Sequence, residues 1–372
     1  MEKLILSSYK EILYFIAKCL TISFEDRNKE AIEKQLQSYS IDWDVVVKVS
    51  TAHYVLPALY CNFHKSNFLH YLPKKLVAYM EHITNLNRKR NEEIITQARK
   101  LNTLLLSNNI EPIFLKGTAN LIARIYEDIA ERMVGDIDFI ISKNDYPKAI
   151  KVLRDNGYSA VHNYKYHFPN EKHYRRLQKK NSIAAVEIHY ELVDKKKYLS
   201  EFNYNLVNKD NQVLNGVTVL SYRNKLNLSI IANQINDNGY HFKTIALKNA
   251  YDVFLLSKKT NAKNAVNSLG KLTHPLSFFL AACYDIFGKV NSLKYKNTKT
   301  IVVCMSIFNS QFINWERTKR KHKRIKTCLL LKSRLGIIYK SILYKKYRDW
   351  LFRRLTDIKW YKEKLIQLGF CK

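Results

Sequence analysis

Two aspartates separated by a single residue, Asp136 and Asp138, lie in the short apolar segment DIDFII. Side chains at positions i and i+2 of a β-strand leave the same face, with Cα atoms about 6.6 Å apart. Two carboxylates that point together each disfavour the ionised form of the other. A divalent cation between them removes that cost. Mg²⁺ suits such a site because it takes oxygen ligands and typically binds through one or two carboxylates together with phosphate oxygens.

A second alternating segment, AAVEIHYEL, places Glu187, His189 and Glu191 on one face. If this strand lies beside DIDFII, Glu187 can supply a third carboxylate. A site that holds two ions about 3.5–4 Å apart needs such an extra ligand. Glu187 can instead accept a proton from an attacking hydroxyl.

The tripeptide Lys116-Gly117-Thr118 follows an apolar run and precedes a helix-like segment. Gly117 lets the backbone approach an anion, and the first N–H groups of a helix can bind phosphate oxygens. Lys116 and Arg132 are cations that can neutralise the charge of a triphosphate. Taken singly, each of these residues also fits a wet strand edge, a surface position or a helix-entry turn. Together, in this order, they indicate phosphoryl or nucleotidyl transfer.

The elements that must position these residues form a mixed core between two helical regions. Residues 1–108 read as helical, most clearly from Leu76 to Leu106, where apolar residues recur at steps of three and four. Residues 109–223 alternate short apolar runs with helical patterns, and residues 224–372 read as helical and basic. We therefore expect an α+β protein with a small mixed β-sheet core and these three regions.

Local signals support the reading of the core. Asp145 can cap a helix over PKAIKVLRDN, and Gly157 can end it before a new strand. VLNGVTVLSY predicts a hairpin that turns at Asn215-Gly216.

Composition limits the class of protein. The 372 residues are 47% hydrophobic, which indicates a packed protein rather than a disordered one. The net charge of +31 suits a polyanionic partner, although lysine enrichment also follows from an AT-rich genome. Six scattered cysteines without a CxxC pair argue against structural zinc and favour a reducing cytoplasm. No uncharged stretch reaches the length of about 18 residues expected of a membrane span, and no signal peptide is evident.

The run FLKGTANLIARIYEDIAERMVGDIDFII, followed by DYPKAIKVLRDNGY and VEIHYEL, resembles a bacterial family called uncharacterised nucleotidyltransferases, a branch of the polymerase-beta-like nucleotidyltransferase superfamily. The resemblance covers roughly residues 76 to 255. The residues that match the family pattern in order are Leu115, Lys116, Gly117, Tyr126, Arg132, Asp136, Asp138, Gly157, Tyr158, Glu187 and His189.

This resemblance implies a mixed sheet that carries the two aspartates and a third acid, with Mg²⁺, or Mn²⁺ as the alternative ion. It also implies transfer of a nucleoside monophosphate, from ATP or another nucleoside triphosphate, to an acceptor. That acceptor is a sugar, a metabolite, a protein or RNA. Lys116, Gly117, Thr118 and Arg132 would hold the triphosphate, and His189 would orient Glu187 or the substrate. The broader superfamily has Gly-Ser after its first strand, where this chain has Lys116-Gly117-Thr118.

The region from Trp315 is strongly basic, with seven lysines and arginines between Arg317 and Lys326. Apolar residues further on predict an amphipathic helix that could lie on an anionic membrane surface or follow a phosphate backbone, with Tyr347 and Trp350 as stacking surfaces. A solvated helix face is an equally good reading. Contact of residues 315–354 with nucleic acid or an anionic membrane is thus one of two open readings. We expect the protein in the cytoplasm, with a peripheral position at the inner membrane face as the alternative. A non-catalytic basic module of this kind is the alternative to a transferase, and a kinase-like phosphotransferase is a third reading.

Overall fold

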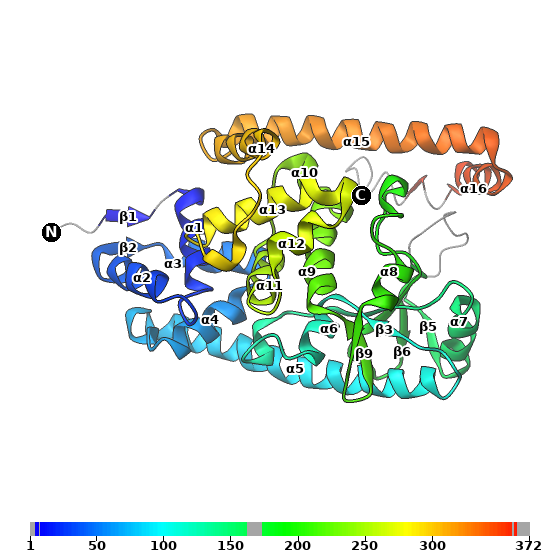
Figure 1. The fold of residues 1–372 in the computed structure, drawn as a ribbon, viewed down its shortest axis with the longest axis horizontal. Helices are drawn as coiled ribbons and strands as arrows, with labels where there is room; N and C mark the ends of the chain where they lie inside the picture. The colour runs from blue at the N-terminus through cyan, green and yellow to red at the C-terminus, as the bar shows by residue number, and fades with distance from the viewer. Residues whose placement is uncertain (1–3, 7, 162–172, 359–360, 363–372) are drawn as a thin grey trace. The chain divides into compact units, whose positions relative to one another are not determined.

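The computed structural model of the chain describes residues 4–6, 8–161, 173–358 and 361–362. The described residues fall into two compact units, one that ends at residue 313 and another that begins at residue 314. Figure 1 labels most of the helices and several of the strands. The fold is α+β, with one seven-stranded mixed sheet and helical regions before and after it, as the sequence predicts.

The first unit begins with helices and with two short strands that pair in parallel. Its opening elements are β1 (Leu4–Leu6), α1 (Tyr9–Cys19), α2 (Asp26–Ser38), β2 (Tyr39–Ile41), α3 (Trp43–Ala52), α4 (Leu56–Lys65) and the 3₁₀ turn η1 (Leu69–Tyr71). A capping box starts α1: the Ser8 hydroxyl accepts from the N–H of Glu11, and the Glu11 carboxylate accepts from the N–H of Ser8. The apolar faces of α1, α3 and α4 pack together and form the first part of the core.

Helix α5 (Lys74–Leu106) is the scaffold of the sheet. Its 33 residues span about 50 Å, and its buried residues recur at steps of three and four, although those between Met80 and Ile94 are polar. Figure 1 shows it in cyan along one side of the sheet. Four of its amide side chains hold backbone outside the helix, among them Asn102, which donates to the carbonyl of Gly216 at 3.0 Å. Asn87 and Asn91 donate to carbonyls of residues 129–132, and Gln97 exchanges two hydrogen bonds with the backbone of Ala184.

The sheet has the strand order β5-β6-β7-β4-β3-β9-β8. Its strands are β3 (Ile113–Phe114), β4 (Asp136–Ile140), β5 (Tyr158–Ala160), β6 (Leu177–Lys179), β7 (Ala185–His189), β8 (Asn211–Leu214) and β9 (Val217–Leu220). The pairs β4–β7 and β3–β9 are parallel and the others are antiparallel. Strand β4 is therefore central, and it lies beside β7 as the sequence analysis required.

The connections within this core follow their local signals. They contain α6 (Lys116–Ile122), the 3₁₀ turn η2 (Ile129–Glu131), α7 (Tyr146–Asp155), η3 (Lys196–Tyr198) and α8 (Tyr204–Lys209). Gly157, at φ +85°, follows α7 and leads into β5. Asn215 and Gly216 both have positive φ and form the tight β8–β9 turn that was predicted.

Helices complete the first unit. They are α9 (Tyr222–Ile231), the π-helical turn η4 (Ala232–Asn236), α10 (Gly239–Phe242), α11 (Leu247–Ser257), α12 (Ala262–Asn267), η5 (Gly270–Leu272), α13 (Thr273–Ile286), η6 (Asn291–Leu293) and α14 (Lys299–Ser310). Helix α11 is buried along almost its whole length and packs on α9. It brings Tyr251 and Asp252 against the loop that precedes β4.

The second unit consists of α15 (Trp315–Leu343) and α16 (Lys345–Leu355), which pack against each other. Tyr347 and Trp350 of α16 are only 5% and 8% exposed, so the prediction that they offer open stacking surfaces is wrong. Within the described ranges, every helix falls short of the length and apolar character that a membrane crossing requires.

Candidate active site

The register of β4 and β7 brings the predicted carboxylates together. In this parallel pair Asp138 lies opposite Glu187, and the side chains of both are nearly buried. His189, two residues further along β7, is 2% exposed and faces the same side. The apolar residues that alternate with them, Ile137 and Ile188, are fully buried on the other side of the sheet. Three polar groups therefore share one face because both strands keep the two-residue period.

His189 binds both acids. Its Nε2 lies 2.8 Å from Asp138 Oδ1 and 3.4 Å from Glu187 Oε2. A nitrogen that close to a carboxylate oxygen donates its proton, so the ring fixes the direction of both carboxylates. That His189 orients Glu187 or the substrate stays a prediction. One ligand atom from each of these three residues lies within 4.8 Å of the others, which is compact enough to hold a metal ion.

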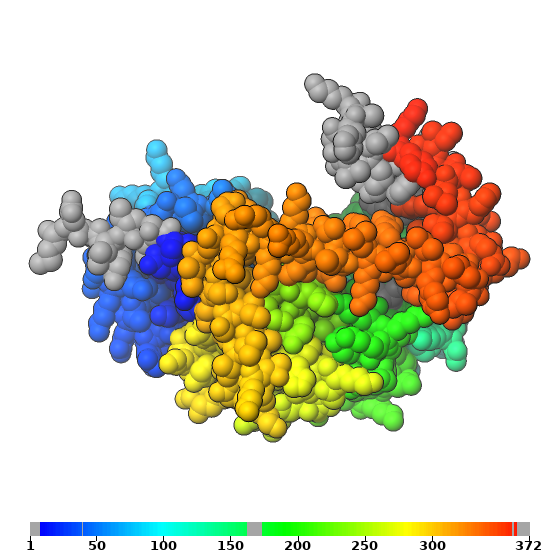
Figure 2. Space-filling view, turned by 90° about the horizontal axis from the view of Figure 1, so that it is seen from above, coloured from blue at the N-terminus to red at the C-terminus, as the bar shows by residue number. Residues whose placement is uncertain are grey.

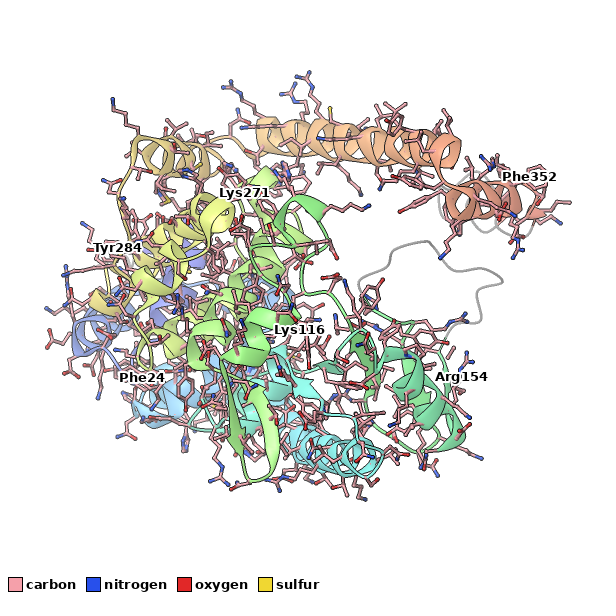
Figure 3. The ribbon with its side chains drawn as sticks, turned by 45° about the vertical axis from the view of Figure 1, so that its right-hand side comes forward. Phe24, Lys116, Arg154, Lys271, Tyr284 and Phe352 are labelled. Carbon is pink, nitrogen blue, oxygen red and sulfur yellow. The ribbon has the colours of Figure 1, made fainter. Side chains whose placement is uncertain are left out.

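Lys116 reaches the same carboxylates from the start of α6. Its backbone has φ +50°, a conformation that few non-glycine residues adopt, and its Nζ donates to Asp138 and lies 3.9 Å from Glu187 Oε2. Burial lowers the pKa of Lys116, but the charge of Asp138 more than compensates, and the pKa is raised. Lys116 is therefore a cation at the centre of the site, and Figure 3 labels it where α6 meets the sheet.

Arg176 is a second cation, which the sequence analysis missed. It lies directly before β6, and its Nη2 is 2.7 Å from Asp136 Oδ2 while its Nε is 2.8 Å from Glu187 Oε1. One guanidinium group therefore bridges the first aspartate and the glutamate. Its side chain is 53% exposed, so water screens both contacts and the arginine can exchange them for other anions.

The three acids differ in how well they are compensated. Burial raises the pKa of Asp138, and Lys116 and His189 lower it further than burial raises it, so the net pKa is depressed. Glu187 behaves in the same way: burial opposes ionisation, but hydrogen bonds from His189 and Arg176 hold its pKa well below the ordinary value. The pKa of Asp136 is raised, first by burial and then by the two neighbouring acids, against the effect of Arg176. Asp136 is the least stabilised anion of the three.

Gly117 and Thr118 have packing roles in this structure. A Cβ at Gly117 would lie 2.8 Å from a methyl carbon of Val134, so glycine is needed for the close approach of α6 to the loop before β4. Thr118 is 1% exposed, and its hydroxyl donates to the carbonyl of Asp136 at 3.2 Å. These residues fix α6 against β4. Their contact with a triphosphate stays a prediction.

Arg132 lies in a separate buried cluster. Its Nε is 3.1 Å from Asp252 on α11, and the Tyr126 hydroxyl donates to the same carboxylate at 2.7 Å. Burial lowers the pKa of Arg132, but the charge of Asp252 outweighs that effect and the pKa is raised. The pKa of Lys248, one turn before Asp252, is lowered first by burial and then by the charges of Arg132 and Lys116. The sequence-predicted triphosphate ligand is thus paired with an acid that sequence reasoning did not identify.

Glu191 does not join the site, although it alternates in step with Glu187 and His189. Strand β7 ends at His189, and the Glu191 carboxylate pairs with Lys143 at 2.5 Å. The alternation of polar and apolar residues in the sequence therefore extends beyond the end of strand β7.

The donor set suits a divalent cation. Two carboxylates and one imidazole, those of Asp138, Glu187 and His189, lie within 4.8 Å of one another. Asp136 is not part of this compact group but shares Arg176 with Glu187, and Lys116 and Arg176 supply the compensating positive charge. Hard cations prefer carboxylate oxygens, and a buried cluster of acids is stable only when cations neutralise it.

Comparisons with known proteins identify the family of the chain. A family model described as "Uncharacterised nucleotidyltransferase" matches residues 39–285. The curated proteins contain no match. Two crystal structures from Helicobacter pylori are similar: JHP933, with 12% identity and a TM-score of 0.28, and a candidate nucleotidyltransferase, with 13% identity and a TM-score of 0.27. Each comparison covers 65% of this chain, and 97% and 96% respectively of the other chain. At such TM-scores the two structures add nothing to the family assignment. The family model alone supports it, because the model spans more than half of the chain. The chain belongs to the family of uncharacterised nucleotidyltransferases.

Proposed function

We propose that the protein transfers a nucleoside monophosphate from a nucleoside triphosphate to an acceptor hydroxyl, with release of pyrophosphate, and that it depends on Mg²⁺ or Mn²⁺. The observation that carries this proposal is the convergence of Asp136, Asp138 and Glu187 from two adjacent parallel strands, with Lys116 and Arg176 between them. Family membership makes the chain a transferase. The metal, the triphosphate and the reaction are our inference from the site.

The three acids would hold the metal. A bound divalent ion would neutralise phosphate oxygens and activate the attacking oxygen. Asp138 and Glu187 are held in place by His189, so their oxygens are preorganised. Asp136 has the highest cost of ionisation among the three, and a cation beside it would remove that cost.

Lys116 and Arg176 would hold the triphosphate. Each is bonded to carboxylates in this structure, and each is a good donor to phosphate oxygens. Arrival of a triphosphate with its metal would turn these cations from the acids to the phosphates. Gly117 and Thr118 would place the backbone of α6 next to them. Arg132 would act indirectly, because its pair with Asp252 holds the loop before β4 against α11.

Glu187 is better suited to bind metal than to accept a proton. Its depressed pKa keeps it ionised at neutral pH but makes it a weak base. The acceptor hydroxyl would then lose its proton to water or to a base of its own. This choice between the two roles foreseen for Glu187 follows from its three cationic or N–H neighbours, Lys116, Arg176 and His189.

The test uses each of the four nucleoside triphosphates labelled at the α-phosphate, with Mg²⁺, in cell extract. We expect label to move to an acceptor with release of pyrophosphate, and we expect the Asp136→Asn/Asp138→Asn variant to lose this transfer. The size and nuclease or protease sensitivity of the labelled product would distinguish a sugar, a metabolite, a protein and RNA.

Parallel reactions with γ-labelled triphosphate separate nucleotidyl transfer from phosphoryl transfer. Label that moves to an acceptor from the γ-phosphate, with release of nucleoside diphosphate, would identify a kinase-like enzyme instead. If neither label moves and neither protein binds nucleotide in the presence of metal, the carboxylates are structural and the reading of a non-catalytic module is correct.

A further inference from the structure

The second unit exposes an unusual number of apolar side chains. Among the described residues 23 large hydrophobic side chains are exposed, and 13 of them lie between Trp315 and Tyr361. Isolated exposed apolar residues need no explanation, but a contiguous group marks an interaction surface. In Figure 2, α15 (orange) is an elongated rod whose side chains stand out along its length.

Four of these apolar residues lie on one face of α15, in line with three exposed arginines and a cysteine. Steps of three and four residues connect eight exposed positions: Arg317, Arg320, Arg324, Cys328, Leu331, Leu335, Ile338 and Ile342. Positions at this spacing share one side of a helix. We call this set the α15 face. Its first half is cationic, and its second half is apolar, with Leu335 65% and Ile342 70% exposed.

The rest of α15 explains why this face stays open within the unit. Ile337 and Ser341 are buried, and they lie on the side of α15 away from Leu335. Helix α16 packs on α15, and the Lys340 ammonium stands 5.2 Å from the ring of Tyr347, a buried residue of α16. The contact between the two helices therefore uses a different side of α15.

The charge of the unit is strongly positive and largely uncompensated. Residues 315–358 contain 15 lysines and arginines against three acids, a net charge of +12 out of +31 for the chain. Of the seven cations between Arg317 and Lys326, the structure pairs only Lys319 with a carboxylate, that of Glu316 at 2.9 Å, as far as the described residues extend. Free cations on a helix attract an anionic surface.

We propose that the α15 face binds an anionic lipid membrane and that α15 lies in the plane of the interface. The arginines of its first half would contact lipid phosphates, and Leu331, Leu335, Ile338 and Ile342 would enter the boundary between head groups and acyl chains. The charge and the exposed apolar face are both needed for this mode of binding. It is independent of the reaction proposed above.

Two other occupants fit the α15 face less well. A nucleic acid would satisfy the arginines but would leave the leucines and isoleucines in water, because a phosphate backbone offers them no apolar surface. A second copy of the chain could bury the apolar half in a parallel coiled coil, but that pairing would set Arg317, Arg320 and Arg324 against their own copies. An anionic membrane matches both halves.

The experiment measures co-sedimentation of the full chain with vesicles of phosphatidylcholine alone and of phosphatidylcholine with 30% phosphatidylglycerol. We expect binding only to the anionic vesicles, weakened by salt. Leu335→Asn/Ile338→Asn should lower the partition coefficient by roughly tenfold or more, because two exposed apolar side chains no longer enter the lipid. The matched control is Val302→Asn/Val303→Asn on α14, which removes two equally exposed apolar residues and should change binding less than about twofold.

A second pair of variants tests the cationic half. Arg320→Glu/Arg324→Glu and Lys323→Glu/Lys326→Glu change the net charge equally, but Lys323 and Lys326 lie off the α15 face. The first should weaken binding more than the second. Circular dichroism checks that the helices remain in every variant. The proposal fails if wild-type protein ignores anionic vesicles or if Leu335→Asn/Ile338→Asn binds them normally. It also fails if the protein does not bind vesicles and this variant disrupts a dimer in sedimentation velocity. Binding of RNA that does not depend on the apolar residues would contradict it as well.

Discussion

The site on the sheet and the α15 face handle charge in opposite ways. At the site, acids and cations from β4, β7, α6 and the residue before β6 are matched within 4 Å, and most are buried. On α15 the charges are of one sign, close in sequence and exposed. Buried matched charges depend on exact partners, because a lost partner leaves an uncompensated ion. Exposed like charges act through their sum. Single substitutions should therefore be severe at the site and mild on α15.

The strongest form of this contrast compares two glutamates on one segment. Glu187→Gln should reduce nucleotidyl transfer on the order of a thousandfold. Glu187 is both a proposed metal ligand and the partner of Arg176, and the substitution removes its charge. Glu191→Gln should change the rate less than about twofold, since Glu191 only pairs with Lys143 outside β7. Transfer rates at saturating metal and triphosphate decide this. Equal losses in the two variants would contradict the site.

A buried pair outside the acid cluster gives the next largest effect. Arg132→Met should destabilise the protein by about 3–5 kcal/mol, because it leaves Asp252 buried without its cation. Arg154→Met removes an exposed arginine from α7 and should cost no more than about 0.5 kcal/mol. Urea unfolding measures both changes. If Arg132→Met unfolds normally but loses triphosphate binding, Arg132 is a substrate ligand, as the sequence suggested, rather than a structural cation.

Glu131 offers a pH test of buried charge. Burial raises its pKa to about 7, although Tyr251 donates to its carboxylate at 2.6 Å. An acid whose pKa is raised on folding stabilises the fold below its unfolded pKa, and this stability is lost as pH rises through the folded value. Wild-type protein should therefore lose about 2–3 kcal/mol relative to Glu131→Gln between pH 4.5 and 7.5. Melting temperatures of both proteins across this range provide the measurement, and parallel pH curves would refute the expectation.

The sequence predicted the parts of this picture that depend on local periodicity. The facing of Asp136 and Asp138, the alternation around Glu187, the long helix α5 and the hairpin at Asn215-Gly216 all follow from periods of 2 and 3.6 or from turn chemistry. The register that sets Asp138 opposite Glu187 depends on the pairing of two strands that are distant in sequence. Local periodicity does not predict that pairing, so the sequence could only suggest it.

The residues that sequence reasoning missed depend on contacts between distant segments. Asp252 meets Arg132 across 120 positions, with no pattern that connects them. Arg176 stands before a strand of three residues, which is too short for a periodic signal. The burial of Tyr347 and Trp350 depends on tertiary packing, which the amphipathic pattern of a single helix does not reveal.

Arg176 gives the smallest effect and the most direct test of how the site exchanges cations. Its guanidinium occupies the oxygens of Asp136 and Glu187 that the proposed metal would use. In Arg176→Gln the metal no longer competes with this group, so Mn²⁺ should bind the nucleotide-free protein roughly tenfold more tightly, while triphosphate binding should weaken. Electron paramagnetic resonance of free Mn²⁺ measures the first effect, and calorimetry with a triphosphate measures the second.

Arg154→Gln is the control for this last variant, because it removes an exposed arginine whose recorded partner is the Tyr174 hydroxyl. It should leave the affinities for metal and for triphosphate unchanged. Stability should change little in Arg176→Gln, since the arginine is half exposed and its pairs are screened. If Mn²⁺ binds more weakly to Arg176→Gln than to wild type, Arg176 helps to assemble the metal site instead of competing with the metal. Lys116 and Arg176 would then act together with the metal rather than replace it when no metal is bound.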